Sequence, residues 1–223
     1  MDGPDEIPQV PLEERLARRL ETAPSPRRSA AASILNELAE VDRAVYRAVA
    51  STPTPTLDEP MRRLSGLADD SKLWLGVAGA LFVLGGRAGR RAAVTGLVAL
   101  GIDSAIVNLP MKFTSGRTRP DRESADVPEQ RWVPMPSSTS FPSGHSASGF
   151  AFAAAVAGSM PGLAIPLRGL AAAVAYSRVH TGVHYPGDVV VGSLIGASIG
   201  EATSFVGRSL HRRRERRRAG RAE

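Results

Sequence analysis

The chain has 223 residues, which is enough for one domain with an additional segment. It contains no cysteine, which excludes a disulfide framework and a thiolate metal site. The formal charge of +6 is local, because residues 208–223 carry eight arginines against two glutamates. Mean hydropathy is −0.09, low for a polytopic membrane protein, but this average combines polar ends with long apolar runs in the middle of the chain.

The first 71 residues are polar. Residues 1–29 carry several prolines and charges of both signs, lack the features of a cleavable signal peptide, and are predicted to be poorly ordered. Apolar residues recur at helical spacing over 30–50 and predict an amphipathic helix, which either packs on its own domain or lies on the membrane surface. Three prolines in 51–60 should break this helix, and another short one is expected over 57–67. Residues 30–71 are therefore predicted to be amphipathic or interfacial helices.

Five hydrophobic segments follow within residues 72–207. They are 73–86, 92–111, 146–160, 163–176 and 187–206. Segments 92–111 and 187–206 have about the length that spans a bilayer, and 73–86 is short for a span. Small residues crowd all five, as contacts between membrane helices prefer. Gly192, Gly196 and Gly200 recur every four residues and mark one smooth helix face. The sequence predicts an all-α polytopic membrane helical bundle, with a soluble all-helical core as the alternative.

Arginines set the predicted orientation of this bundle. Three clusters lie between or after the hydrophobic segments: Arg87, Arg90 and Arg91; Arg168; and the tail 208–223. With five spans, all three fall on one side, which the positive-inside rule makes the cytoplasm. The loops 113–144 and 179–186 would then face outward from the plasma membrane. The same topology places residues 1–71 outside, unless the helix at 30–50 enters the bilayer.

The two outward loops hold residues suited to binding an anion. Lys112, Arg119 and Arg178 are cations at the ends of apolar segments, where they could hold a tetrahedral dianion. Ser143 and Gly144 open the third hydrophobic helix, whose free N–H groups and positive dipole end favour an anion. Glycine also lets the backbone approach a ligand closely.

Two histidines and an aspartate complete a candidate catalytic set. His184 and Asp188 are four positions apart across a Pro-Gly turn, so the carboxylate could fix the imidazole tautomer and leave the other nitrogen free to attack. His145 could protonate a departing oxygen. The set lacks the clustered carboxylates of a Mg²⁺ or two-metal phosphatase, so we expect no metal and no cofactor. His180 and His211 are expected to be incidental.

Each of these features alone has an ordinary explanation, since basic residues at membrane ends often snorkel and an aspartate in a first helical turn often faces the helix dipole. Their joint pattern resembles the type 2 phosphatidic acid phosphatase (PAP2) superfamily, including actinobacterial members. The three motifs of that family are K-x6-R-P, P-S-G-H and S-R-x5-H-x3-D. The chain matches every fixed position in order: Lys112, Arg119 and Pro120; Pro142 to His145; and Ser177, Arg178, His184 and Asp188. The resemblance covers roughly residues 61–207.

The resemblance implies a role for each matching residue. His184 would be the nucleophile that forms a phosphohistidine, Asp188 would orient it, and His145 would protonate the leaving group and then activate water. The phosphoryl oxygens would be held by five residues: Lys112, Arg119, Ser143, Gly144 and Arg178. Membrane members of the family usually have six spans, so the expected total is five to six, with the helix at 30–50 a candidate replacement for the first.

The expected function is a metal-independent lipid phosphatase. Candidate substrates are a polyprenyl phosphate or diphosphate, a polyprenyl-linked sugar phosphate, or a phosphatidate-type lipid. The first alternative is a vanadium haloperoxidase, which shares this constellation, although those enzymes are usually large and soluble. The second is a non-catalytic membrane scaffold. The arginine-rich tail is expected to contact anionic membrane lipid rather than nucleic acid, and the sequence leaves the oligomeric state and the choice of lipid open.

Overall fold

The computed structural model describes residues 26–107 and 115–219. No strand occurs among these residues, so the predicted all-α class is confirmed. The chain divides into two units, residues 1–41 and residues 42–223. Each unit is described below by itself.

In the first unit, the described residues form the N-terminal part of helix α2 (Pro26–Ser51). The helical spacing over 30–50 thus predicted this element correctly. Its apolar Ile34, Leu35 and Leu38 are exposed. Contact of this helix with the membrane surface stays a prediction.

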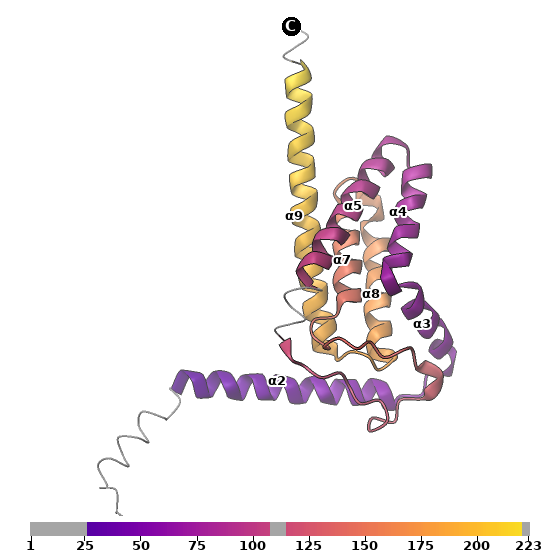
Figure 1. Ribbon diagram of the computed structural model, residues 1–223, viewed down its shortest axis with the longest axis vertical. Helices are drawn as coiled ribbons and strands as arrows, with labels where there is room; N and C mark the ends of the chain where they lie inside the picture. Colours follow the sequence, from indigo (N-terminus) through magenta and orange to yellow (C-terminus); the bar gives the residue numbers. More distant parts are fainter. Residues whose placement is uncertain (1–25, 108–114, 220–223) are drawn as a thin grey trace, which may run out of the picture. The chain divides into compact units, whose positions relative to one another are not determined.

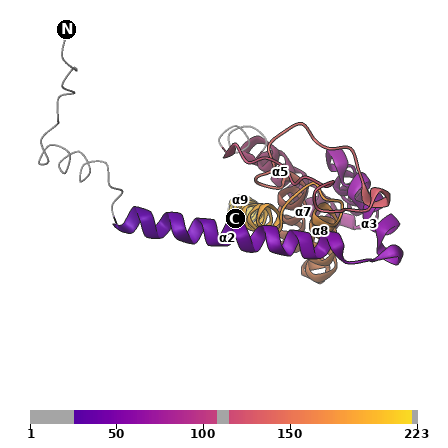
Figure 2. The same cartoon turned by 90° about the horizontal axis from the view of Figure 1, so that it is seen from below.

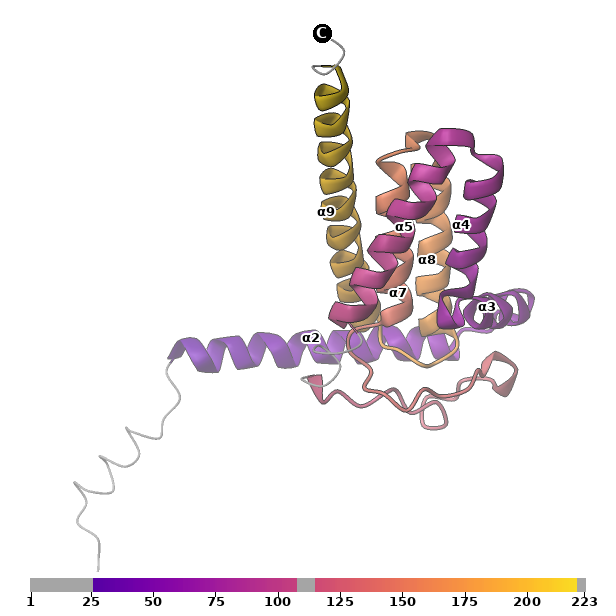
Figure 3. The same ribbon diagram turned by 45° about the horizontal axis from the view of Figure 1, so that its top comes forward.

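The second unit contains the C-terminal turns of α2 and all the following helices. In chain order these are α3 (Pro55–Leu67), η1 (Asp69–Ser71), α4 (Lys72–Leu84), α5 (Gly86–Ile106), η3 (Glu129–Arg131), α7 (Gly144–Ala157), η4 (Pro161–Leu163), α8 (Ala164–His180) and α9 (Pro186–Ala219). Figures 1 and 3 show α4, α5, α7, α8 and α9 side by side in one bundle, with α7 in contact with α5, α8 and α9. Ten of the fourteen residues of α7 are buried and none is exposed, which makes this helix the centre of the bundle.

Small residues bring α7 and α9 into backbone contact. A Cβ added at Gly192 would lie 2.5 Å from the carbonyl oxygen of Ser143. A Cβ at Gly196 or at Gly200 would collide with a backbone carbonyl oxygen of α7. The smooth glycine face predicted from the sequence therefore packs against α7, and it lets the first turns of α7 and α9 lie close together.

Larger side chains fill the other half of the bundle. The rings of Trp74 and Phe152 lie 5.5 Å apart in a core cluster shared by α4, α5, α7 and α8. A Cβ at Gly96 would lie 2.6 Å from the Phe152 ring, so α5 packs closely on α7 at this level. Between the same two helices, buried Asp103 accepts a hydrogen bond of 2.8 Å from the Ser148 hydroxyl.

The segment 115–143 crosses the end of the bundle where α8 ends and α7 and α9 begin, as Figures 1 and 2 show from two directions. Arg131 anchors it, because its fully buried guanidinium donates 2.8 Å to Asp58 and 2.7 Å to the carbonyl of Thr52. Its other donors reach the carbonyls of Val49 and Ala50, both at 3.2 Å. One arginine thus fastens the long loop to the junction of α2 and α3.

All five hydrophobic segments coincide with helices, but α5 begins before the predicted segment 92–111 and α9 continues past 206 to Ala219. Residues 108–111 of the second segment lie outside the described residues. The expected break over 51–60 was partly wrong, because α3 begins at Pro55 and contains Pro60. Pro55 occupies the first turn of α3, where a backbone N–H has no intrahelical partner to lose. By length and composition, one helix of the described chain could cross a membrane, at Pro186–Arg213. The predicted number of spans therefore stays a prediction.

Candidate active site

His184 lies in the short connection between α8 and α9. Its side chain is almost completely buried. Gly182 makes the turn possible, because its φ is +72° and a Cβ there would lie 2.9 Å from Cγ of Arg122. The backbone N–H groups of Val183 and His184 then both donate to the carbonyl of Arg178, at 3.1 and 3.2 Å. The conformation of Gly182 and these backbone hydrogen bonds therefore define the turn that carries His184.

The imidazole of His184 stands between a cation and a carboxylate. Nη1 of Arg119 lies 3.1 Å from Nε2, and Nδ1 lies 3.5 Å from Oδ2 of Asp188, which is long for a hydrogen bond. A guanidinium can only donate, so Nε2 carries the lone pair and Nδ1 carries the proton. Burial lowers the pKa of His184 to about 4; Arg119 and Arg178 act in the same direction, while Asp188 opposes them. The imidazole is therefore neutral at pH 7, with the lone pair of Nε2 directed at Arg119.

Asp188, in the first turn of α9, is held by three donors. Arg117 donates to it at 2.7 Å, the backbone N–H of Tyr185 donates at 2.9 Å, and the Ser140 hydroxyl donates through a short hydrogen bond. The carboxylate is fully buried. It is therefore fixed in position and aimed at the Nδ1 side of His184.

Arg117 connects Asp188 to a second carboxylate. Its other terminal nitrogen lies 2.5 Å from Asp42 in the last turns of α2, and its guanidinium stacks 4.4 Å from the ring centre of Tyr185. Asp42 in turn accepts from the backbone N–H of Gly187 at 2.6 Å. The sequence prediction missed both residues. Arg117 occupies a variable position of the K-x6-R-P motif, and Asp42 lies in a helix with no motif.

Arg119 holds two loops together as well as contacting His184. It donates to the carbonyls of Ser138 at 2.9 Å, Val183 at 2.8 Å and Thr139 at 3.2 Å. The conformations of the 138–139 and 183–184 segments are thus coupled through one guanidinium. Burial lowers the pKa of Arg119, but the side chain stays a cation at neutral pH.

The start of α7 lies against the start of α9. The backbone N–H of Ser143 donates to the carbonyl of Asp188 at 3.0 Å, and its buried hydroxyl accepts from the N–H of Ser146 at 3.5 Å as a helix cap. The N–H groups of Gly144 and His145 belong to the first turn, which has no intrahelical acceptors. Any anion at this helix end would therefore meet backbone N–H groups. The Ser143 hydroxyl accepts hydrogen bonds as a cap and keeps its own hydrogen to donate.

His145 has a carboxylate of its own. Its Nε2 lies 2.8 Å from Oδ1 of Asp69, and Nη1 of buried Arg178 lies 3.7 Å from the same oxygen. The hydrogen bond from His145 holds the pKa of Asp69 below its usual range. Arg178 also donates 2.5 Å to the Ser65 hydroxyl, while its Nε has no hydrogen-bond partner within the described chain. Asp69 thus links His145 to Arg178, and nothing in the sequence had distinguished it from Asp70 beside it.

Three sequence expectations concern residues outside this group. Lys112, expected among the phosphate-binding residues, lies outside the described residues. His180 is structural, since its buried ring contacts Thr54 at 3.0 Å and Asp58 at 3.2 Å. His211 belongs to the far part of α9. Within ranges 26–107 and 115–219, no group of three or more His, Cys, Asp or Glu could hold a metal ion.

Comparison with known proteins matches more than half of the chain to one family. The sequence model of the PAP2 superfamily matches residues 92–208, which contain both described motif loops. A decaprenylphosphoryl-5-phosphoribose phosphatase from Mycobacterium tuberculosis is 42% identical over 100 residues, which are 45% of this chain and 53% of that protein. The chain thus matches about half the length of this relative.

Two solved structures are similar in fold. A transmembrane PAP2-type phosphatidylglycerolphosphate phosphatase from Bacillus subtilis has a TM-score of 0.60 and 23% identity, over 80% of this chain and 88% of that one. LpxE from Aquifex aeolicus has a TM-score of 0.61 and 26% identity, over 73% of this chain and 94% of that one. The family match covers more than half of the chain, the motifs are intact, and the fold agrees: the chain belongs to the PAP2 superfamily.

Proposed function

We propose that this protein is a metal-independent membrane lipid phosphatase that works through a phosphohistidine on His184. The observation that carries the proposal is the state of that side chain. It is buried, neutral at pH 7, and presents Nε2 to a guanidinium while Nδ1 faces a fixed carboxylate. This arrangement is what an imidazole nucleophile needs.

In the first step, Nε2 of His184 attacks phosphorus as the bond to the leaving oxygen breaks. The lipid alkoxide or phosphate takes a proton from His145. Arg119 and Arg178 neutralise the phosphoryl oxygens, with Lys112 and the backbone N–H groups of the α7 first turn as further donors. Arg119 already touches Nε2, so a phosphoryl group arriving at this nitrogen comes within reach of the same guanidinium.

In the second step, water attacks the phosphohistidine. His145, now neutral, takes a proton from the water, the P–N bond breaks, and inorganic phosphate leaves. Nδ1 of His184 keeps its proton throughout both steps. Asp188, which faces Nδ1, stabilises the positive charge that develops on the ring during attack. The donors on Asp188 prevent it from turning away.

Asp69 enters this scheme as a positioning residue. It restrains the ring of His145 and offsets the positive charge of Arg178. Asp69 belongs to η1, which stands between α3 and α4 and contacts α7. The turn between these helices thereby helps to place a catalytic group that belongs to α7.

The substrate that we favour is a polyprenyl-linked sugar phosphate. The similarity to a decaprenylphosphoryl-5-phosphoribose phosphatase supports this choice over a phosphatidate-type lipid. Because the match extends over 100 residues at 42% identity, we propose that the two proteins share a phosphate-binding core. Lipid specificity would depend on the groups around that core, including the 122–140 segment.

The bundle would be a multi-pass protein of the plasma membrane, with residues 72–207 as its phosphatase domain. The described motif residues gather at the end of the bundle where α7 and α9 begin, and the turn between α4 and α5, with its arginines, lies at the opposite end together with the tail of α9 (Figure 1). This separation supports an extracytoplasmic active site and a cytoplasmic 208–223 tail.

The test is phosphate release by the purified protein in detergent with EDTA. Substrates would be a polyprenyl phosphate, a polyprenyl diphosphate, a polyprenyl-linked sugar phosphate and a phosphatidate, with His184→Ala as the control. We expect His184-dependent release, fastest from the sugar phosphate. Release that requires Mg²⁺ would refute metal independence, and strong bromide oxidation with vanadate bound would point to a haloperoxidase.

A further inference from the structure

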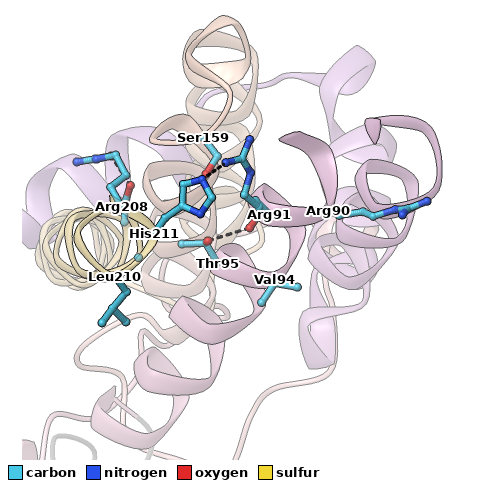
Figure 4. A pocket seen from close by; sticks show the side chains of 10 residues that line it. Arg90, Arg91, Val94, Thr95, Ser159, Arg208, Leu210 and His211 are labelled. Atoms are coloured by element: carbon cyan, nitrogen blue, oxygen red, sulfur yellow. Dashed lines mark hydrogen bonds between the residues drawn. The ribbon is translucent and has the colours of Figure 1, made fainter. Parts of the chain in front are cut away.

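A pocket lies far from the proposed catalytic residues. It occupies about 440 Å³ between the first half of α5 and the last part of α9, and Figure 4 shows its lining. Asp188 and Arg208 are 20 positions apart on α9, which corresponds to about 30 Å along a helix. The pocket therefore cannot share a ligand's phosphate with His184.

Arginines give this pocket an excess of positive charge. Arg91 of α5 points to His211 of α9, with Nη1 2.8 Å from the ring Nε2 (Figure 4). Arg208 donates 2.5 Å to the Ser204 hydroxyl, and Arg90 lies over the Phe82 ring at 5.7 Å. Within the described chain, none of the three arginines forms an ion pair with a carboxylate. Such a site has donors and charge to offer an anion.

An apolar groove of about 520 Å³ runs on from the basic pocket along α5 and α9. The two share four lining residues: Val94, Thr95, Gly207 and Leu210. The groove then continues between Val98 and Ile102 on one side and Ile199 and Val206 on the other. Among the described residues that line it, the only polar side chains are those of two threonines. Val98 and Val206 are half exposed, so the groove is open along its length.

We propose that the α5–α9 face binds one anionic phospholipid. Its phosphodiester would sit between Arg91 and Arg208, and an acyl chain would lie in the groove. Charge complementarity selects an anion, and the continuous apolar groove selects one that carries a hydrocarbon chain. A soluble anion would use the pocket without the groove, and a neutral lipid would use the groove without the pocket. This site is independent of the proposed phosphatase activity.

The experiment is native mass spectrometry of the full chain in detergent, titrated with phosphatidylglycerol or with phosphatidylcholine of the same acyl chains. We expect one phosphatidylglycerol to be retained preferentially. Removing one cation costs a charge-assisted contact, so Arg91→Gln and Arg208→Gln should each weaken retention roughly tenfold. Arg87→Gln, at the same end of the bundle but outside the pocket, should leave it unchanged. Equal loss in Arg87→Gln would mean diffuse surface charge and would overturn the proposal.

Two further arms test the groove and the location. Ala202→Trp fills the groove and should weaken retention, whereas Leu194→Trp, on the same helix outside it, should not. If lipid retention were unchanged in Ala202→Trp, or if inorganic phosphate abolished it at equal concentration, the pocket would be a free-anion site and the lipid assignment would be overturned. Loss of retention in Arg119→Gln with none in Arg91→Gln would place the lipid at the catalytic end and would also refute it. A melting curve for each variant confirms that it is folded.

Discussion

Nε2 of His145 lies 2.8 Å from Oδ1 of Asp69, a residue 76 positions earlier in the chain. The site therefore contains two histidine–carboxylate pairs of different origin. His184 and Asp188 are only four positions apart in the sequence, whereas His145 and Asp69 are brought together by the packing of η1 on α7. The first pair has donors that fix its carboxylate from three directions. The second shares its carboxylate with Arg178, and Asp69 is part exposed.

The first prediction concerns Asp69→Asn, which removes the carboxylate that restrains His145. We expect slower hydrolysis of the lipid substrate, by less than the roughly 10²- to 10⁴-fold that a general acid supplies. Hydrolysis of p-nitrophenyl phosphate, whose leaving group needs little protonation, should fall much less. Asp70→Asn is the matched control, since Asp70 is exposed and pairs with Lys72. Equal losses on the two substrates would mean that Asp69 is merely structural.

The second prediction concerns pH. The folded-state pKa of His184 is about 4, below its unfolded value of about 6.5, so the folded state binds fewer protons. The stability that this histidine contributes in its neutral form is fully present above about pH 6.5 and is lost as pH falls towards 4. Wild-type protein should therefore lose more stability than His184→Gln over this window.

The measurement is thermal unfolding in detergent at several pH values, together with ¹⁵N NMR of labelled histidine. The NMR signal should show His184 neutral at pH 6, with the proton on Nδ1. An imidazolium at pH 6 in the free protein would contradict both the burial argument and the assignment of Nε2 as nucleophile.

The third prediction concerns Arg131, the buried anchor of the long loop. Arg131→Met leaves Asp58 and four backbone or hydroxyl acceptors without their donor. Breaking a buried pair in this way costs about 3–5 kcal/mol. Arg63→Met, which breaks a surface pair with Glu59, should leave the unfolding midpoint almost unchanged, because water screens an exposed ion pair. Equal changes in unfolding midpoint would show that the loop is not anchored through Arg131.

The fourth prediction concerns membrane topology. A reporter fused after the arginine-rich tail should be active only in the cytoplasm, and one inserted near Glu123 only outside. Carbonate extraction should leave the protein in the membrane pellet. Release into the supernatant would favour the soluble all-helical alternative, and reversed reporters would mean that the arginine clusters do not set the orientation.

The sequence predicted the parts of the site that are local. His184 and Asp188 lie four positions apart around a helix start, so their proximity follows from helix geometry. The five bundle helices likewise follow from continuous apolar composition. Asp69, Asp42 and Arg117 could not be predicted in the same way, because each acts through a partner more than 70 positions away. Their own neighbourhoods look like ordinary polar turns or a polar helix face.

Contacts between distant residues also explain why the expected helix break over 51–60 was partly wrong. A proline near a helix start and a proline inside a helix look alike in the sequence. The contacts of α3 with α8 and with η3 determine that Pro60 lies inside a helix. Pro60 costs one backbone hydrogen bond inside α3. Burial of Arg131 against the α2–α3 junction and of Ser65 against Arg178 keeps that helix in place.

The last prediction separates the two histidines of the site. In the proposed mechanism His184 forms the bond to phosphorus, so His184→Ala should abolish both the phosphoenzyme and turnover on every substrate. In the same mechanism His145 only moves protons, so its loss should matter most when the leaving group is a poor one such as a lipid alkoxide. His145→Ala should therefore retain much more phosphoenzyme formation, relative to wild type, on p-nitrophenyl phosphate than on the lipid. Rapid-quench trapping with ³²P-labelled substrates measures this directly.

The second step gives this prediction an internal check. In the proposed mechanism His145 also activates the water that cleaves the phosphohistidine, and that step is the same whichever ester supplied the phosphoryl group. On p-nitrophenyl phosphate, His145→Ala should thus form the phosphoenzyme and then accumulate it, with a burst of p-nitrophenol followed by slow turnover. Wild type should show no such accumulation unless its own second step is slow. If His145→Ala formed no phosphoenzyme while His184→Ala did, the two roles would be exchanged, and the buried neutral ring beside Asp188 would need another explanation.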